Sequence, residues 1–230
     1  MLGQNYKNFR ILFVDDASNY TTGQKKYIGK KLQGHIVRFN KERQHSLRNA
    51  YEMILTFAKN DDAVVLNLDA DDWLIDKNVL TEIANTYNRT GCLLTYGECK
   101  IFENNELTNK PSRVLKEHTN IPYPERIIKT NSYRKYPFLP LHPRTWKVWL
   151  FKKIKKEDFL REDGSWIEFA EDQAIFYPML EMSNGRFCVI SIPLYVYSIE
   201  TQHSDTKQNL IGLLRDELII RRKKPYEPIS

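Results

Sequence analysis

An apolar run that ends in carboxylates constrains the fold of this chain more than any other segment. Residues 63–68 read Ala-Val-Val-Leu-Asn-Leu, and Asp69, Asp71 and Asp72 follow within four positions. A short run rich in Val and Leu is typical of a strand that is buried on both faces, as in a parallel α/β sheet. Ligands of open α/β sheets bind beyond the carboxyl ends of the strands. The three carboxylates are therefore expected to border a crevice.

Carboxylates crowded at the end of a strand suit a divalent cation. They repel one another when ionised, and a bound cation removes that cost. Carboxylate oxygens are suitable ligands for Mg²⁺ or Mn²⁺. An alternative is that Asp72 or Asp76 caps the next helix or forms an Asx turn, as Asp often does after a strand. An EF-hand loop fits poorly, because Leu74 stands where that loop needs Gly.

The composition is that of a folded protein in a reducing compartment. The chain has 230 residues, which is enough for one large α/β domain or two small ones, and we expect one. Hydrophobic residues make up 41% and charged residues 28%, which argues against global disorder. The three cysteines are an odd number without metal-ligand spacing, so the sequence indicates neither a disulfide framework nor a zinc site.

Charge and hydropathy limit the partners that we expect. The sequence contains no apolar run of about 18 residues and no signal-peptide pattern at its start, so we expect a cytoplasmic protein, either free or peripheral at a membrane. The net charge is +6, and basic residues are dense at residues 152–156 and 221–224. Such runs are usually solvated surface, but they can attract an anionic lipid surface or nucleotide. We do not expect a nucleic-acid partner.

Strand and helix patterns alternate in the first half of the chain. The predicted strands span residues 9–14, 34–39, 63–68 and 92–102. A first helix is predicted to begin near Thr21 or Thr22, and two further helices are predicted at residues 46–58 and 76–87. The β-α-β-α-β order of residues 9–68 predicts a parallel sheet with helices on its faces.

The second half has weaker patterns. Residues 111–143 contain prolines at 111, 122, 124, 137, 140 and 143, and we predict an irregular segment with acceptor contacts or a lid. Residues 145–153 are predicted as helix or turn, and residues 168–182 as a helix that Pro178 kinks or shortens. Residues 186–197 are predicted as a strand pair, or as one strand broken by Pro193. Residues 210–220 are predicted as an amphipathic helix.

Four segments resemble family 2 glycosyltransferases in the order that the family has them. Residues 4–18 resemble the second-strand signature, in which Gln-x-Tyr-x-Asn leads to Val-Asp-Asp-x-Ser. The further matches are Arg48-Asn49, the Asp-x-Asp motif in residues 68–72, and Glu171-Asp172. Residues 142–147, His-Pro-Arg-Thr-Trp-Lys, look like the acceptor-side segment of the family. These matches lie between residues 4 and 205, nearly the whole chain.

The resemblance implies a single α/β domain with the GT-A fold, whose mostly parallel sheet is flanked by helices. It also implies inverting, hexosyltransferase-like transfer of a sugar from a nucleotide diphosphate sugar to a hydroxyl of a glycan, lipid or protein. By this resemblance Asp15 and Asp16 lie on the nucleotide side, with Asp16 accepting from the ring N–H of the base. Asp69 and Asp71 contact ribose and diphosphate, and Arg48 either pairs with the diphosphate or points to solvent.

The resemblance also assigns the metal and the base. Asp71, Asp72 and His203 are the expected ligands of Mn²⁺ or Mg²⁺, which stabilises the departing diphosphate. Asp172 is the expected general base, which takes the proton of the acceptor hydroxyl as its oxygen attacks the anomeric carbon. The plain alternatives are a surface role for His203 and an exposed acidic helix start for Glu171-Asp172. Trp146 and Trp149 are expected in the core, or one of them against an acceptor sugar.

Two departures from the family change what we expect. Family members carry a strand and helix with a Pro-x-Tyr-Asn motif before the segment that begins at Gln4, so this chain is expected to be N-terminally truncated. The sheet is then expected to have an open edge in its middle, which a partner chain or a dimer can fill. Gln44 stands where the family often has Gly. The alternatives to an active enzyme are a non-catalytic remnant that acts as a binding module and, more distantly, a nucleotidyltransferase.

The expected domain limits follow the motifs. Residues 1–209 form the glycosyltransferase domain, with a nucleotide-sugar half at 1–102 and an acceptor half at 103–209. Residues 210–230 form a C-terminal helix and basic tail.

Overall fold

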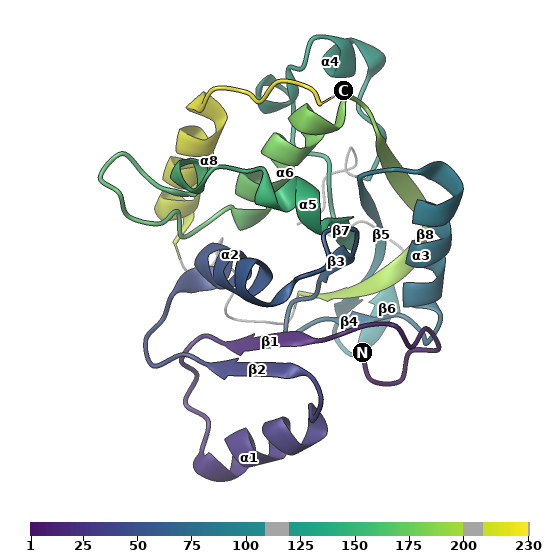
Figure 1. Ribbon diagram of the computed structural model, residues 1–230, viewed down its shortest axis with the longest axis vertical. Coiled ribbons are helices and arrows are strands. Elements are labelled where there is room, and N and C mark those ends of the chain that lie inside the picture. Colours follow the sequence, from purple (N-terminus) through teal and green to yellow (C-terminus); the bar gives the residue numbers. More distant parts are fainter. Residues whose placement is uncertain (109–119, 200–208, 230) are drawn as a thin grey trace.

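The computed structural model describes residues 1–108, 120–199 and 209–229. Its N-terminal unit consists of β1 (Leu12–Asp15), α1 (Thr22–Lys31) and β2 (Ile36–Phe39), and the two strands are parallel. Helix α1 begins where the sequence predicts, because Thr21 and Gln24 form a reciprocal capping box. None of its residues is buried, and Figure 1 shows the unit at one end of the molecule.

Helix α2 (His45–Phe57) leads from this unit to β3 (Val64–Asn67), which confirms the predicted β-α-β-α-β order. The helix buries Leu47 and Ile54, which lie on the predicted apolar face, and it also buries Met53, while the predicted Leu55 is exposed.

The main sheet has six strands and is mixed. The remaining strands are β4 (Trp73–Leu74), β5 (Leu94–Glu103), β6 (Glu106–Thr108), β7 (Arg144–Lys147) and β8 (Phe187–Ser198). The order is β3-β7-β5-β8-β4, and β6 pairs with β5. In the part of this sheet that the structure describes, only β5 and β8 pair in parallel, and the other pairs are antiparallel. The α/β class is confirmed, but the expectation of a mostly parallel sheet is wrong, because the short strand β7 inserts antiparallel between β3 and β5.

The ladder is interrupted between the two sheets. Among the described residues, β1 pairs with β2 and β3 pairs with β7, and no pairing joins β1 to β3. All four residues of β3 are only half buried, whereas strands inside an α/β sheet are usually covered. The expected open edge therefore lies between β1 and β3.

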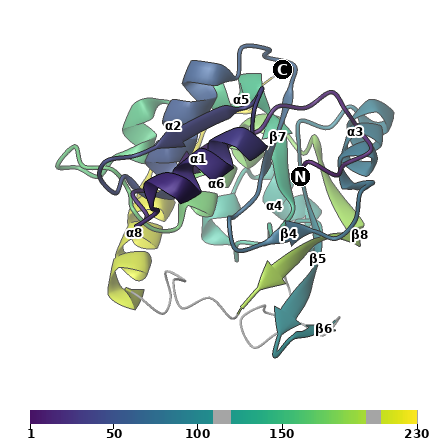
Figure 2. The same cartoon turned by 90° about the horizontal axis from the view of Figure 1, so that it is seen from below.

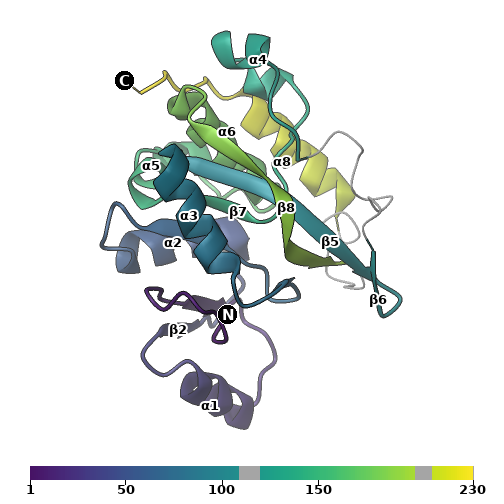
Figure 3. The ribbon, with the colours of Figure 1, turned by 90° about the vertical axis from the view of Figure 1, so that its right-hand side faces the viewer.

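Helices cover both faces of the six-stranded sheet (Figure 3). Helix α3 (Val79–Thr90), which ends at the left-handed Gly91, covers one face and packs Val79 and Ile83 against the sheet. The other face carries the larger core, to which α5 (Val148–Lys152), α6 (Glu171–Ser183) and α8 (Leu210–Arg222) contribute. None of the helices in the described part of the chain is long and apolar enough to cross a membrane.

Residues 120–143 are more ordered than the sequence suggests. They contain α4 (Glu125–Lys129) and the 3-10 helix η1 (Tyr133–Lys135), and a second 3-10 helix, η2 (Lys156–Phe159), follows α5. Tyr123, Tyr133 and Leu139 are buried in the main core. The predicted irregular segment or lid is therefore part of the core in its described residues, because irregularly spaced aromatic side chains anchor it.

Of three further expectations about the second half of the chain, one is confirmed and two differ from the structure. Trp146 is buried between aromatic rings of α5 and α6, which confirms its core role. Residues 144–147, predicted as the beginning of a helix or turn, form β7. The expected break at Pro193 is wrong: β8 is one strand, and the ladder to β5 shifts register around Glu98. Pro193 lies at this shift, where its missing N–H interrupts the ladder least.

Candidate functional site

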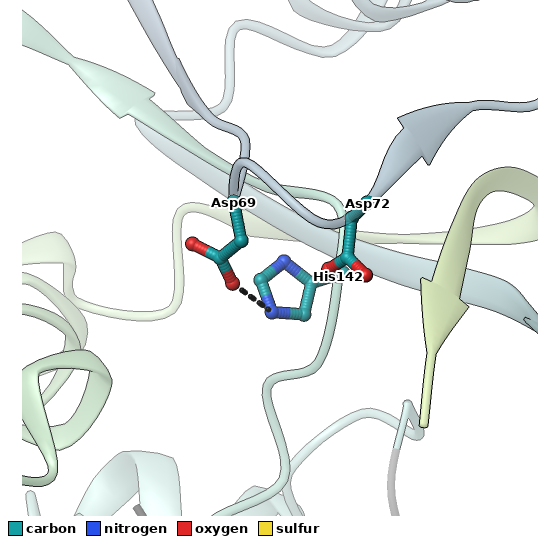
Figure 4. Close-up of side chains that lie close together, drawn as sticks. All are labelled: Asp69, Asp72 and His142. Carbon is teal, nitrogen blue, oxygen red and sulfur yellow. Dashed lines mark ion pairs between the residues drawn. The ribbon is translucent and has the colours of Figure 1, made fainter. Parts of the chain in front are cut away.

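The acidic stretch after β3 turns back towards the sheet. The Asp72 N–H donates to the Asp69 carbonyl over 3.2 Å, and β4 begins at the next residue. Ligand atoms of Asp69, Asp72 and His142 lie within 4.8 Å of one another, and Figure 4 shows the imidazole between the two carboxylates. Asp71 is exposed on the turn and does not belong to this cluster.

The sheet register explains why His142 faces Asp69. In the antiparallel pair β3 and β7, Asn67 lies opposite Arg144. Continuing this register by two residues beyond each strand places Asp69 opposite His142. The sequence analysis assigned residues 142–147 to the acceptor side and missed His142 as a cation ligand, since a single histidine in a proline-rich segment has no pattern of its own.

Asp72 is buried and held by β8. The Tyr195 hydroxyl donates to its Oδ2 over 2.8 Å, and the Ser198 N–H donates to its Oδ1 over 2.8 Å. Burial raises the pKa of Asp72 to about 7 against the effect of these hydrogen bonds, and the charges of Asp69 and Asp71 raise it further. The helix-capping alternative therefore does not describe Asp72. Asp76 fits the Asx-turn alternative, since its Oδ1 accepts from the Asn78 N–H two residues on.

His142 is a buried, neutral imidazole. Its ring stacks on Tyr195 with a centroid distance of 4.4 Å. Nε2 lies 2.6 Å from Arg144 Nη2 and 3.5 Å from Asp69 Oδ2. Burial and the charge of Arg144 lower the pKa of His142 well below its usual value. Because a guanidinium only donates, Nε2 accepts from Arg144, and the Asp69 carboxylate lies near the same nitrogen.

Arg144 joins this cluster to the start of α6. Its Nη1 lies 2.6 Å from Asp172 Oδ2, and its side chain is buried. Asp172 Oδ1 accepts from the Gln173 N–H over 2.8 Å, and 29% of its side chain remains exposed. The chain from Asp69 through His142 and Arg144 to Asp172 is therefore continuous. The structure thus brings together the two acidic motifs that lie about a hundred residues apart in the sequence.

Glu171 points into the same charged region. Burial raises the pKa of its carboxyl to about 7, the nearby charge of Asp69 raises it further, and Arg144 opposes the rise. Its Oε2 is buried without a hydrogen-bond partner among the described residues. The predicted alternative of an exposed acidic helix start therefore does not describe Glu171.

A side chain of α8 holds the loop that precedes Asp172 through hydrogen bonds to its backbone. Asp216 is fully buried and accepts from the N–H groups of Glu168 and Phe169 over 3.0 and 3.2 Å. Arg161 donates to both of its oxygens, over 3.0 and 2.7 Å. Burial alone would raise the pKa of Asp216, but these hydrogen bonds lower it overall. Ala170, which leads into α6, has a left-handed φ of 55°, so this turn depends on its surroundings.

Asp16 organises the start of α2. Its carboxylate accepts from the N–H groups of Gln44 and His45 over 2.8 and 2.9 Å and from the Asn40 side chain over 2.9 Å. Burial opposes ionisation, but the hydrogen bonds lower the pKa of Asp16 overall. Asn40 and Gln44 also line a cavity of about 380 Å³. This cavity places a ligand-sized space beside Asp16.

The remaining predicted residues lie nearby or outside the description. Asp15 is buried at the end of β1, and its Oδ1 accepts from the Ser18 N–H over 3.3 Å. Arg48 donates to Glu52 over 2.9 Å and its side chain is 39% exposed, so its contact with a diphosphate stays a prediction. His203 lies outside the described residues.

Comparison with known proteins gives a family and a fold. A model of the family described as glycosyl transferase family 2 matches residues 1–154. The chain is similar to the crystal structure of TarS 1–349 from S. aureus, with a TM-score of 0.56, 17% identity, and 85% of this chain and 53% of that chain covered. Comparison with curated proteins gave no match.

Two ligand complexes of the same neighbour are also similar. TarS 1–349 in complex with UDP has a TM-score of 0.57 and 18% identity, with 98% of this chain and 60% of that chain covered. The complex with UDP-GlcNAc has a TM-score of 0.54 and 17% identity, with 86% and 52% covered. This chain thus spans between about half and three fifths of these solved chains, and at such identities the likeness concerns the fold alone.

Proposed function

Since this chain belongs to glycosyl transferase family 2 and has its GT-A fold, we propose that it moves a sugar from a nucleotide diphosphate sugar to an acceptor hydroxyl with inversion. One observation carries the proposal. The contacts that join Asp69, His142, Arg144 and Asp172 have a cluster of cation ligands at one end and a partly exposed carboxylate at the other, and His142 and Arg144 between them are buried. Transfer from a diphosphate needs both groups around one anomeric carbon.

Asp69, Asp72 and His142 would hold the cation. The side chains fit one, because ligand atoms of a neutral imidazole and two carboxylates lie within 4.8 Å of one another. A cation bound through Nε2 would replace the Arg144 N–H on that nitrogen. One imidazole among oxygen ligands favours Mn²⁺ over the harder Mg²⁺. Such a cation acts as a Lewis acid on the diphosphate leaving group. Asp71, on the same turn, and His203, which follows β8 in the sequence, remain proposed ligands of the cation.

Asp172 is the proposed general base. Its Oδ2 is oriented by Arg144 and its Oδ1 by the backbone at the start of α6, while part of the carboxylate stays accessible to an acceptor hydroxyl. A carboxylate in this position takes the hydroxyl proton while the oxygen attacks the anomeric carbon. A single displacement of this kind inverts the configuration at that carbon.

The nucleotide is proposed to bind beside Asp15 and Asp16. Asp16 accepts from Asn40 and Gln44 on Oδ1 and from His45 on Oδ2, and a carboxylate oxygen accepts more than one hydrogen bond, so a base N–H can add to these contacts. The TarS complexes contain UDP and UDP-GlcNAc, and this supports a uridine diphosphate sugar as the first donor to test. Arg48 reaches a diphosphate only if it leaves Glu52.

Titration calorimetry with UDP-GlcNAc and Mn²⁺ tests the proposal. We expect binding that disappears when a chelator is added and weakens strongly in Asp69→Asn. Asp163→Asn, on a loop at η2, is the matched control and should bind as the parent does. A folded chain that binds no uridine or guanosine diphosphate sugar with Mn²⁺ present contradicts the proposal.

The interrupted ladder favours a strand supplied by another chain. A strand that pairs with the free edges of β1 and β3 would join the two sheets and cover half-buried β3. A second copy or a partner protein can supply it. Hydrogen exchange of the β1 and β3 amides, measured over a concentration series, tests this. Protection should rise with association, and exchange that is independent of association contradicts it.

The second candidate is a non-catalytic module that binds a sugar or a partner. The same interruption favours it, because the nucleotide side of the fold lacks a continuous sheet. It predicts that Asp172→Asn leaves the biological effect of the protein intact, whereas the enzyme proposal predicts its loss.

A further inference from the structure

Helix α8 has apolar side chains on two faces. Its inner face carries Gly212 and Ile220, which are buried, and Leu213 and Ile219, which pack against the main core. Its outer face exposes four large aliphatic side chains: Leu210 at 51%, Ile211 at 82%, Leu214 at 51% and Leu218 at 53%. At 3.6 residues per turn these four lie within an arc of about 100°. We call them the outer stripe.

The charges beside the outer stripe are positive. Arg215 and Arg222 are seven residues apart, so they lie in one row along an edge of the stripe, and both are exposed. The acidic residues of α8 are matched. Asp216 is fully buried and pairs with Arg161 over 2.7 Å and with Arg215 over 3.2 Å, while the Arg215 side chain stays 52% exposed. Glu217 pairs with Arg221 over 2.9 Å. The exposed surface of α8 therefore combines an apolar stripe with a basic border.

We propose that α8 lies in the plane of an anionic lipid surface, with the outer stripe in the headgroup boundary and Arg215 and Arg222 on the lipid phosphates. A helix with an apolar stripe and a cationic border suits such a surface, where burial of the stripe and attraction of the charges add together. A second copy fits less well, because a two-fold contact through this stripe would bring the arginine rows of both copies together.

The position of α8 agrees with this role. Figures 2 and 3 show α8 and the β5–β6 hairpin projecting towards the same side of the molecule. The β6 strand of this hairpin carries a further exposed aliphatic side chain, Leu107, at 53%. The inner face of α8 holds the loop before Asp172 through Asp216. Lipid contact through α8 would therefore place the membrane beside the helix that holds the loop before Asp172. The lipid contact itself does not depend on sugar transfer.

The basic helix α1 must be separated from α8 experimentally. Residues 1–43 contain nine Lys and Arg and three Asp and Glu, so their net charge of +6 equals that of the whole chain. Helix α1 exposes Lys26 and Lys30 but no comparable aliphatic stripe. Attraction through α1 alone would thus depend on charge and not on the aliphatic side chains of α8.

Co-sedimentation of the full chain with vesicles tests the proposal. The vesicles are phosphatidylcholine alone or with about one third phosphatidylglycerol, an anionic lipid content at which polybasic segments bind. Three variants are compared with the parent: Ile211→Ser/Leu214→Ser/Leu218→Ser, Arg215→Gln/Arg222→Gln, and the control Lys26→Gln/Lys30→Gln. The replaced aliphatic side chains are at least half exposed, so the stripe variant should fold, and circular dichroism checks this.

We expect the parent to bind anionic vesicles and to bind neutral ones much less. The partition coefficient of the stripe variant for anionic vesicles should be at least tenfold lower, because three aliphatic side chains no longer bury apolar surface in the lipid. The arginine variant should lose most of the preference for anionic lipid, and the α1 control should keep it. Absence of parental binding, or equal binding by the stripe variant, overturns the proposal. So does a parental dimer that the stripe variant dissociates while neither protein binds vesicles.

Discussion

Arg144 lies 2.6 Å from Asp172 with one nitrogen of its guanidinium and 2.6 Å from His142 with another. It therefore connects the two acidic motifs that the sequence places far apart. A buried arginine in this position fixes the direction of the Asp172 carboxylate, because two planar groups in contact have few alternative arrangements. The proposed base and the proposed cation ligands are thus positioned by the same side chain.

Replacement of the base should separate chemistry from donor binding. We expect Asp172→Asn to lower the rate of sugar transfer by roughly 10²–10⁴, the range that a general base contributes. Affinity for UDP-GlcNAc with Mn²⁺ should change little, since the proposed donor contacts lie on the other side of Arg144. Single-turnover transfer and calorimetry measure the two quantities. An equal loss of both would instead assign Asp172 to the donor site.

Removal of one cation ligand should weaken Mn²⁺ binding while the fold stays intact. We expect Asp72→Asn and His142→Gln each to weaken Mn²⁺ binding at least tenfold in calorimetry, and Asp76→Asn to leave it unchanged. Because burial raises the pKa of Asp72 to about 7, its carboxyl must lose a proton before it can bind a cation at lower pH. Affinity should therefore rise between pH 6 and pH 8. Pronounced binding at pH 6 with no further rise contradicts this assignment.

The sequence predicted the elements whose signals are local. The run at residues 63–68 ends in acidic residues and forms β3, and the Thr21 cap starts α1 where predicted. The resemblance correctly indicated the family, and the structure connects the Asp-x-Asp stretch to Asp172 through His142 and Arg144. These features depend on residues close together in the chain or on whole motifs.

The sequence did not predict what depends on strand insertion. Arg144–Lys147 has a strand conformation because it pairs with β3 on one side and β5 on the other, and its four residues show no clear alternation. His142 faces Asp69 only as a result of that insertion. The structural roles of Asp16 at the start of α2 and of Asp216 before α6 likewise require contacts that no spacing reveals.

The stability of the metal-free protein should fall as the pH rises through neutrality. Folding raises the pKa of Glu171 from an ordinary 4.5 to about 7, so between these values the native state binds more protons than the unfolded state. The free energy of unfolding then decreases with rising pH, and Asp72 acts in the same direction. We expect the urea midpoint, measured with a chelator, to fall from pH 5 to pH 8. Glu171→Gln should flatten this fall, and Glu227→Gln should not.

Asp216 should affect catalysis through the loop before Asp172. Asp216→Asn weakens the paired contact with Arg161 and one support of the Glu168 and Phe169 amides. A displacement of about 1 Å at a reacting group can cost up to about 100-fold in rate. We expect a lower kcat with an unchanged KM for the donor and unchanged helical content. Glu168→Gln, which alters the contacts of Glu168 with Arg161 and His45 but leaves Asp216 in place, should have a smaller effect, and equal effects would exclude this positioning role.

The pair of Arg134 and Glu181 should be the most sensitive ion pair in the described core. Arg134 donates to both oxygens of Glu181 over 2.6 and 2.9 Å and to the Ile220 carbonyl over 2.6 Å, and both side chains are buried. The pair therefore ties η1, α6 and the end of α8 together. Arg134→Met leaves a buried carboxylate without its partner and should lower the free energy of unfolding by about 3–5 kcal/mol in urea titration.

Replacement of both partners should cost less than replacement of one. In Arg134→Met/Glu181→Met no unpaired charge remains, and the two side chains fill the same space with apolar atoms. We expect the double variant to be more stable than either single variant, which a double-mutant cycle measures directly. Additive losses would mean that the two residues stabilise the fold through separate contacts, such as the Ile220 carbonyl and the Tyr226 N–H, and not as a pair.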